Sequence, residues 1–232
     1  MKTTEEIEFC LEAFTEKYGL DALSAAQGST AWLQLKLGVL SASNASKIVA
    51  KKDSATRWTY IYDLVAQVAS GVTEEINSKY LDYGKEHESA AQALYELTTK
   101  KKITTVPFVY KSSSFRYGCS PDGIIDGQHG LELKVPFNPT NYVKFLCAEN
   151  IEPEYMWQVQ YSMWILGCDT WDFAMYSPVM KVKPMKIVTV KKDLEKHKVL
   201  DDMVPQFSND MELELLNIGL KFGDQWDRLK VK

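Results

Sequence analysis

Apolar residues recur at helical spacing over the first hundred residues and again in the last third of the chain. In the first such segment, Gly19 follows the last apolar position as a stop signal. The same spacing predicts helices over residues 5–18, 31–38, 58–68, 155–166 and 203–220, together with a long helix that follows Asn77. Ser41 or Ser43 is placed to cap a further helix that runs through Ile48.

The apolar period changes to that of strands in the middle of the chain. Strands are predicted over residues 103–110, 115–125, 131–135, 171–176 and 186–190. Residues 126–130 have the composition of a turn, which would fold the third of these strands back beside the second. Helices before, between and after a sheet predict the α/β class. Because no repeat, low-complexity tract or linker interrupts this pattern, we expect one domain over residues 1–232.

Composition and charge narrow the functional classes. The chain has 232 residues, of which 45% are hydrophobic, and this excludes intrinsic disorder. Its 27 Lys and Arg residues are outnumbered by 31 Asp and Glu residues, so the formal charge is −4. That balance excludes a strongly basic nucleic-acid binder, but it is compatible with a locally basic face.

The cysteines and the apolar runs bear on the cellular compartment. The four cysteines form no C-x-x-C pair, which is typical of reduced thiols and argues against a disulfide framework or a zinc site. The first residues lack the apolar core of a signal peptide, and no apolar run approaches the roughly 18 residues of a membrane span. We therefore expect a cytoplasmic protein with no membrane partner.

Several common catalytic motifs are missing from the sequence. There is no phosphate-binding G-x-x-x-x-G-K-[ST] loop, no G-x-S-x-G elbow and no H-E-x-x-H. The chain has three histidines, so histidine-centred catalysis has few candidates. These absences favour carboxylates as the catalytic groups.

The most informative segment is Ser-Pro-Asp-Gly at residues 120–123, followed by Leu-Glu-Leu-Lys at residues 131–134. Taken separately, Pro-Asp-Gly is typical of a turn, and Glu-x-Lys on a strand is typical of a solvent-facing charge pair. Together, the two segments predict a shared site. Glu132 and Lys134 point to the same face of a strand that folds back beside Asp122, because side chains alternate along a strand. Two carboxylates and an amine would then converge at one end of a hairpin.

This trio of side chains suits metal-dependent hydrolysis of a phosphodiester. Two carboxylates can hold Mg²⁺ through hard oxygen ligands while the ion keeps several waters. The ion lowers the pKa of a bound water and neutralises charge that builds up on the phosphate. A neighbouring lysine can orient or help deprotonate that water and can stabilise the anionic transition state.

Over residues 31–226 the chain resembles the phage lambda exonuclease family, which are YqaJ-like viral recombinases of the PD-(D/E)XK nuclease superfamily. The similarity rests on blocks that occur in the same order at residues 31–43, 84–88, 119–123, 130–134, 158–164 and 222–226. An ordered set of this kind is far more specific than the short P-D…E-x-K core. The resemblance implies a restriction-endonuclease-like core, in which a central mixed β-sheet is flanked by helices.

The resemblance also implies catalytic roles for individual residues. Asp122, Glu132, the backbone carbonyl of Leu133 and Glu88 would bind the metal, and Lys134 would be the catalytic lysine with Gln158 beside it. The implied cofactor is Mg²⁺, as two ions, with Mn²⁺ as a substitute. From the pattern alone, Glu88 is typical of an exposed helix glutamate, and Gln158 suits equally well a polar residue that caps an aromatic core helix.

Residues that would contact DNA follow from the same resemblance. Lys36, Ser43 and Ser120 would hold a terminal 5′-phosphate. The family has an arginine at the position of Lys36, and lysine supplies the charge without the bidentate fork. Leu81 matches an apolar wedge that helps separate the strands, although a lone leucine on a helix is also typical of ordinary packing. Arg57 lies in a basic loop and is expected to contact DNA.

The implied activity is that of a processive, Mg²⁺-dependent 5′→3′ exonuclease that degrades one strand of linear double-stranded DNA to mononucleotides. The resemblance further implies a homotrimeric ring around DNA ends and a single-strand annealing protein that loads on the exposed 3′ strand during recombination. A phage- or prophage-encoded protein in a bacterial host is expected. Two alternatives remain open, namely a sequence- or structure-specific PD-(D/E)XK endonuclease and a catalytically inactive DNA-end-binding protein.

Overall fold

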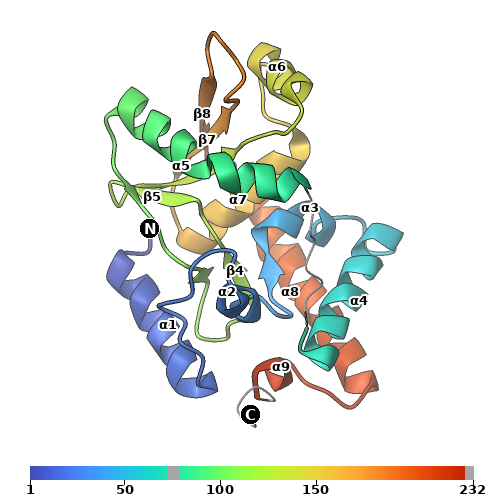
Figure 1. Ribbon diagram of the computed structural model, residues 1–232. Coiled ribbons are helices and arrows are strands. Elements are labelled where there is room, and N and C mark those ends of the chain that lie inside the picture. Colours follow the sequence, from blue (N-terminus) through green and yellow to red (C-terminus); the bar gives the residue numbers. More distant parts are fainter. Residues whose placement is uncertain (73–78, 228–232) are drawn as a thin grey trace.

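The computed structural model describes residues 1–72 and 79–227, with the side chains of residues 79–81 outside the description (Figure 1). In this part of the chain the helices are α1 (Thr4–Tyr18), α2 (Thr30–Leu35), the 3₁₀ turn η1 (Ala42–Asn44), α3 (Ala45–Ile48), α4 (Ala55–Ser70), α5 (Lys79–Thr99), α6 (Pro139–Cys147), α7 (Pro153–Leu166), α8 (Leu194–Asn217) and α9 (Asp224–Asp227). The strands are β1 (Leu40–Ser41), β2 (Ile103–Thr104), β3 (Val109–Tyr110), β4 (Tyr117–Cys119), β5 (Gly123–Ile125), β6 (His129–Lys134), β7 (Thr170–Tyr176) and β8 (Met185–Lys191).

The strands of the described chain form two mixed sheets. The larger has the order β2-β5-β6-β7-β8, and the smaller has the order β1-β4-β3. In the larger sheet, β6 is antiparallel to β5 and parallel to β7. Helix α5 covers one face of β6 and α7 covers the other (Figure 1). The α/β class and the mixed sheet flanked by helices are therefore confirmed.

Two of the predicted strands are each divided between the two sheets. Residues 103–110 form β2 in the larger sheet and β3 in the smaller one, and residues 115–125 form β4 and β5 in the same way. The prediction of two continuous strands is wrong because Pro107 and Pro121 have no N–H to donate to a strand ladder. The chain thus changes sheet at Pro121, one residue before Asp122.

The helices agree with the periodicity more closely than the strands do. Helix α1 ends at Gly19, whose φ of 75° lies in the left-handed region that a C-cap requires. Ser41 occupies the cap position of η1, but its side chain makes no capping hydrogen bond. The helix predicted over residues 203–220 begins at Leu194 instead, because Asp193 caps it and Pro205 is accommodated inside it. The short helix α6 was not predicted.

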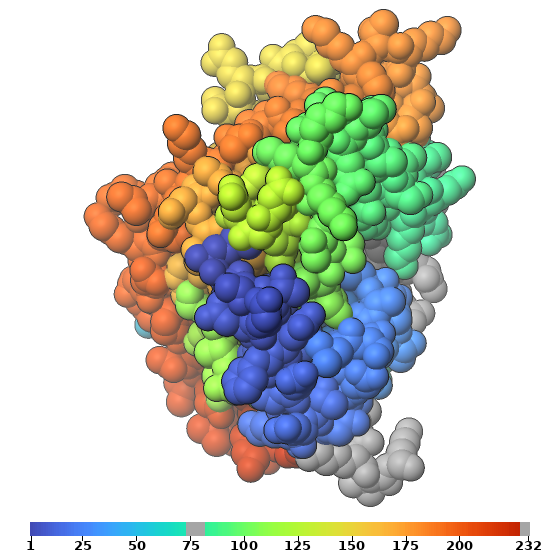
Figure 2. Space-filling model, turned by 90° about the vertical axis from the view of Figure 1, so that its left-hand side faces the viewer, coloured from blue at the N-terminus to red at the C-terminus, as the bar shows by residue number. Residues whose placement is uncertain are grey.

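The N-terminal helix belongs to the same folded unit as the sheets. Figure 2 shows the N-terminal residues in dark blue, packed against the green residues of the middle of the chain. Phe14 stacks on Tyr110 of β3, with ring centroids 5.4 Å apart, and meets Trp226 of α9 edge-on at 4.9 Å. Segments from both ends of the described chain therefore meet beside the smaller sheet.

The four cysteines, all within the described residues, are free thiols. Across residues 1–72 and 79–227, no helix has the length and apolar character needed to cross a membrane.

The position of Arg57 in the structure contradicts the expectation that it contacts DNA. Its guanidinium is buried, 1% exposed, and pairs with Asp210 of α8 at 2.7 Å. It also stacks on Phe207, 4.9 Å from the ring centroid. Arg57 is the third residue of α4 and points toward α8, so the basic character of the preceding loop does not extend to its side chain. In this structure Arg57 joins two helices.

We expect Arg57→Ala to lower the free energy of unfolding by about 3–5 kcal/mol, because it leaves the Asp210 carboxylate without its partner. Arg57→Met leaves the same carboxylate unpaired but fills a similar volume, so it creates no large cavity and should cost less. Lys52→Ala, at an exposed position before α4, should change stability by no more than about 0.5 kcal/mol. Urea denaturation of the three variants measures these differences. Equal stability of Arg57→Ala and wild type would contradict the structural role.

Candidate active site

Glu132 and Lys134 lie on the face of β6 that α7 covers. Lys134 Nζ is 2.6 Å from Glu132 Oε1, and Gln158 Nε2 of α7 donates to the same oxygen at 2.6 Å. Glu132 is only 4% exposed. The predicted common face is confirmed, whereas the alternative of a solvent-facing charge pair is wrong because β6 is covered on both sides.

Asp122 reaches the same place from the point where the chain changes sheet. Its N–H donates to the Leu131 carbonyl at 3.1 Å, and its Oδ2 accepts from the Leu133 N–H at 2.6 Å. These two bonds hold the carboxylate against β6. The predicted convergence of Asp122, Glu132 and Lys134 is therefore present in the structure.

Burial and a neighbouring negative charge both raise the pKa of Asp122. Burial, followed by the neighbouring Glu132, raises the pKa of Asp122 well above its usual value. Lys134 and the Leu133 N–H oppose this rise, and Glu88 adds to it. Two carboxylates in this setting repel each other, so a cation placed between them would be stabilised.

Burial and the neighbouring carboxylates shift the pKa of Lys134 in opposite directions. Burial by itself lowers the pKa of Lys134, but the charges of Glu132 and Asp122 outweigh burial and raise it above its usual value. The amine also lies 5.4 Å from the ring centroid of Tyr155. Its proton is therefore held by the two carboxylates, and any neutralisation of their charge would loosen it.

Glu88 approaches the site from α5. It lines a cavity of about 450 Å³ together with Asp122, Pro107 and the loop 23–27. Its Oε1 accepts a hydrogen bond of 3.3 Å from Gln92, one turn later in α5. The exposed helix glutamate suggested by the pattern is thus a half-buried group beside Asp122.

The acidic groups of this site offer oxygen ligands for a metal ion. In the part of the chain that the structure describes, no three His, Cys, Asp or Glu side chains come close enough together to form a metal-binding group. Asp122 and Glu132 nevertheless provide hard carboxylate oxygens side by side in a buried setting, which is the chemistry that Mg²⁺ requires. Glu88 lies within electrostatic range of them. The donor set therefore fits a hard divalent cation, with Glu88 outside the closest group.

Lys36 and Ser120 are brought together by Trp32, a residue that the sequence analysis did not single out. Lys36 Nζ lies 3.8 Å from the centroid of the Trp32 ring. The indole N–H of Trp32 contacts the Pro107 carbonyl at 2.9 Å and Ser120 Oγ at 3.2 Å. Burial lowers the pKa of Lys36 to about 8, although Glu132 opposes the shift.

The segment that carries Lys36 is anchored by residues near the C-terminus. Gln225 Nε2 donates to the Leu37 carbonyl at 3.0 Å, and Trp226 Nε1 donates to the Gln34 carbonyl at 2.7 Å. Hydrogen bonds that span nearly the whole sequence thus hold this short segment in place.

Ser43 is placed at the same edge of the smaller sheet as Ser120. Strands β1 and β4 are parallel, with Ser41 opposite Gly118, and the two serines follow the carboxyl ends of these strands. Ser43 is exposed, and its Oγ lies 3.3 Å from Ser41 Oγ. Parallel pairing therefore gathers the predicted phosphate-binding residues on one side of the molecule. The predicted wedge, Leu81, has a side chain outside the described residues.

Gln27 is a second residue that the sequence analysis missed. Its Nε2 donates to the Val106 carbonyl at 3.2 Å and to the Pro121 carbonyl at 3.0 Å. These bonds fasten the loop 23–27 beside Asp122, where it forms one wall of the cavity. A glutamine in the loop Leu-Ser-Ala-Ala-Gln has no periodic or motif signal, so the sequence offered no means of finding it.

The sequence of this chain is similar to those of known proteins. The model of the YqaJ-like viral recombinase domain matches residues 31–169. The protein ExoD of Escherichia coli (strain K12) is 42% identical over 78 residues, which are 34% of this chain and 90% of ExoD.

Solved structures of exonucleases share the fold. LHK-Exo in complex with dAMP has a TM-score of 0.76 and 25% identity, covering 82% of this chain and 96% of that one. A second structure of this alkaline exonuclease, from Laribacter hongkongensis, has a TM-score of 0.70 and 23% identity over 80% and 95% of the two chains. A phage-related exonuclease from Haemophilus somnus 129PT has a TM-score of 0.59 and 13% identity, covering 83% of this chain and 95% of its own.

The fold is therefore that of the PD-(D/E)XK nucleases, as expected from the order of the sequence blocks. The matched region includes the two segments that carry Asp122, Glu132 and Lys134. This chain belongs to the YqaJ-like viral recombinase family.

Proposed function

We propose that this protein is a Mg²⁺-dependent 5′→3′ exonuclease that degrades one strand of linear double-stranded DNA to mononucleotides and leaves a 3′ single strand. The observation that carries the proposal is the buried cluster of Asp122, Glu132 and Lys134, held by Gln158 at the point where the chain changes sheet. Membership of a recombinase family with exonuclease structural relatives supports it.

The metal would be held by the carboxylates of Asp122 and Glu132, the backbone carbonyl of Leu133 and, on the α5 side, Glu88. Two Mg²⁺ ions are proposed, with Mn²⁺ as a substitute. When bound, such ions lower the pKa of a coordinated water and neutralise charge on the scissile phosphate.

The protein residues have distinct tasks in this proposal. Gln158 fixes the orientation of Glu132 through its hydrogen bond to Oε1. While their charge is uncompensated, the two carboxylates keep Lys134 Nζ as an ammonium; a bound cation would offset that charge, and burial would then favour the neutral amine. This balance suits a group that orients the attacking water and takes its proton.

The end of the DNA would be bound beside this cluster. Lys36, Ser43 and Ser120 would hold the terminal 5′-phosphate, with Trp32 positioning two of them. A processive homotrimeric ring and a single-strand annealing partner complete the proposal, and both rest on the family alone. Polar contacts to the terminal phosphate would then select an end, and the next phosphodiester would lie beside Asp122, Glu132 and Lys134, where water is the nucleophile.

We expect Asp122→Ala and Lys134→Ala each to reduce digestion of a 5′-phosphorylated linear duplex by roughly 10²- to 10⁴-fold. Asp122→Ala removes an oxygen ligand of the metal, and Lys134→Ala removes the group that handles the proton. Release of acid-soluble nucleotides in Mg²⁺ measures the rate. Lys198→Ala, at an exposed position on α8, is the matched control and should digest at the wild-type rate. Undiminished activity of either site variant would refute the assignment.

A closed circular duplex separates this activity from the endonuclease alternative. An exonuclease that must enter at an end should leave the circle intact over a time in which it fully digests the linear form. Nicking or linearisation of the circle by wild type, and not by Lys134→Ala, would favour the endonuclease. Binding of ends without cleavage in Mg²⁺ and in Mn²⁺ would favour the inactive DNA-end-binding protein.

If Lys36 binds the terminal 5′-phosphate, the preference for 5′-phosphate ends over 5′-hydroxyl ends should depend on pH. With a pKa of about 8, the Lys36 side chain is charged below that pH and loses its charge above it. The ratio of kcat/KM for 5′-phosphate ends over 5′-hydroxyl ends should therefore fall between pH 7 and pH 9, by up to about ten-fold. The phosphate itself does not contribute, since its second pKa is near 6.

Lys36→Arg provides the matched control for this prediction. A guanidinium stays charged across the range, so the ratio should remain constant between pH 7 and pH 9. Taking the ratio cancels pH effects on the catalytic groups, which act on both substrates. A constant ratio in wild type would show that Lys36 does not bind the 5′-phosphate.

A further inference from the structure

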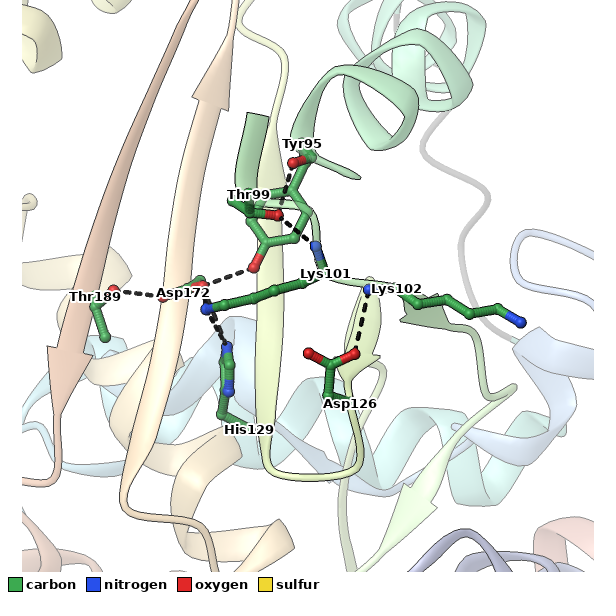
Figure 3. Close-up of polar contacts among 8 residues, drawn as sticks. All are labelled: Tyr95, Thr99, Lys101, Lys102, Asp126, His129, Asp172 and Thr189. Atoms are coloured by element: carbon green, nitrogen blue, oxygen red, sulfur yellow. Dashed lines mark hydrogen bonds and ion pairs between the residues drawn. The ribbon is translucent and has the colours of Figure 1, made fainter. Parts of the chain in front are cut away.

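A buried polar cluster lies on the face of the larger sheet opposite Glu132 and Lys134. At its centre is Asp172 of β7, which is 1% exposed (Figure 3). Its Oδ2 accepts from the hydroxyl of Tyr95 at 2.6 Å and lies 3.1 Å from His129 Nε2 and 3.4 Å from Lys101 Nζ, while its Oδ1 accepts from Thr189 Oγ1 at 2.6 Å. The proposed chemistry uses none of these residues.

Asp172 is held in its charged form by these partners. Burial alone would raise the pKa of Asp172, but the surrounding hydrogen bonds, that of His129 first, outweigh burial and lower it below its usual value. Burial, and then Asp172, raise the pKa of Tyr95, so its hydroxyl stays protonated and donates. A hydrogen bond from a neutral hydroxyl to a buried carboxylate is stronger than one between neutral groups.

Tyr95 and Glu88 lie on the same side of α5. They are seven residues apart, which is about two helical turns and roughly 10 Å along the axis. Between them, Ala91 is fully buried and packs with Leu131 and Leu133 of β6. The stripe that joins α5 to the sheet thus begins at Glu88, beside Asp122, and ends at Tyr95, on Asp172.

The contacts that hold α5 on the sheet gather at its C-terminal half. A small apolar cluster lies beneath the helix, separate from the main core, and its buried members are Ala91, Tyr95, Ile125, Leu131, Leu133 and Ala174. The side chain of Glu96 also accepts from the Ile103 N–H at 2.8 Å. Partly buried side chains pack against the same cluster, namely Ile103, Val135, Tyr176, Met185 and Ile187. Apolar contacts are not directional, whereas the Tyr95–Asp172 hydrogen bond is, so this bond has a large share in fixing the rotation of the helix.

We propose that Tyr95 is a positioning residue for Glu88. Its hydrogen bond to Asp172 holds α5 against the larger sheet at the rotation that places the Glu88 carboxylate beside Asp122. This inference rests on the proposed function, since it concerns a carboxylate assigned to the metal site. Tyr95 itself touches neither substrate nor metal.

The test compares Mn²⁺ binding by the intact wild-type chain and by Tyr95→Phe, measured by titration calorimetry without DNA. Tyr95→Phe keeps the ring in the apolar cluster and removes only the hydroxyl. We expect its Kd for Mn²⁺ to rise about ten-fold, as is typical when a group that orients a metal ligand is lost. The rate of DNA digestion at limiting Mn²⁺ should fall in parallel.

Thr189→Val is the matched control. It removes a hydrogen bond of the same length to the same carboxylate, but Thr189 lies on β8 and does not belong to α5. Its Kd for Mn²⁺ should stay within about two-fold of wild type, even where its thermal stability falls as far as that of Tyr95→Phe. Equal weakening of Mn²⁺ binding in both variants would reduce Tyr95 to a general stabilising residue and overturn the proposal.

A double-mutant cycle with Glu88→Gln decides whether Tyr95 acts through Glu88. If it does, Tyr95→Phe should weaken Mn²⁺ binding by less than about two-fold when Glu88 is already replaced. Additive effects of the two substitutions on Mn²⁺ binding would overturn the proposal.

Unchanged Mn²⁺ binding by Tyr95→Phe, with an active wild type, would overturn this inference alone. A wild type that neither binds Mn²⁺ nor digests DNA would overturn the proposed function and the inference with it.

Discussion

The burial of Asp122 and Glu132 side by side is the constraint on which the rest of the site depends. Placing two carboxylates together away from water is unfavourable unless positive charge or hydrogen-bond donors surround them. The structure supplies the Lys134 ammonium, the Gln158 amide and the Leu133 N–H. Burial, and then repulsion from Glu132, raise the pKa of Asp122 by more than Lys134 and the Leu133 N–H lower it. The same repulsion is what favours a divalent cation at this position.

Strand β6 connects the catalytic groups that face α7 with the apolar residues that face α5. Glu132 and Lys134 face α7, and the alternate residues Leu131 and Leu133 face α5. Because β6 lies inside a sheet, with β5 on one side and β7 on the other, its two faces hold a rigid relation to each other. A helix fastened to one face can therefore present a side chain at the end of the strand where the other face carries the catalytic groups.

The parts that could be predicted from the sequence depend on local pattern. The α/β class followed from the change of apolar period, and the common face of Glu132 and Lys134 followed from the alternation of side chains on a strand. The turn after Ile125 placed this strand beside Asp122, as the antiparallel pairing of β5 and β6 confirms. Local pattern was misleading where a strand was interrupted, since Pro107 and Pro121 outweighed the apolar period on either side of them.

The sequence by itself determined which residue types were available and in what order, and hence the fold class, the hairpin and the carboxylates with their lysine. Only the tertiary structure decided that Arg57 pairs with Asp210, that Trp32 joins Lys36 to Ser120, and that Asp172 gathers donors from α5, β6 and β8. The physical reason is that burial and pairing of polar groups depend on which distant segments pack together. Neither periodicity nor motif spacing carries that information.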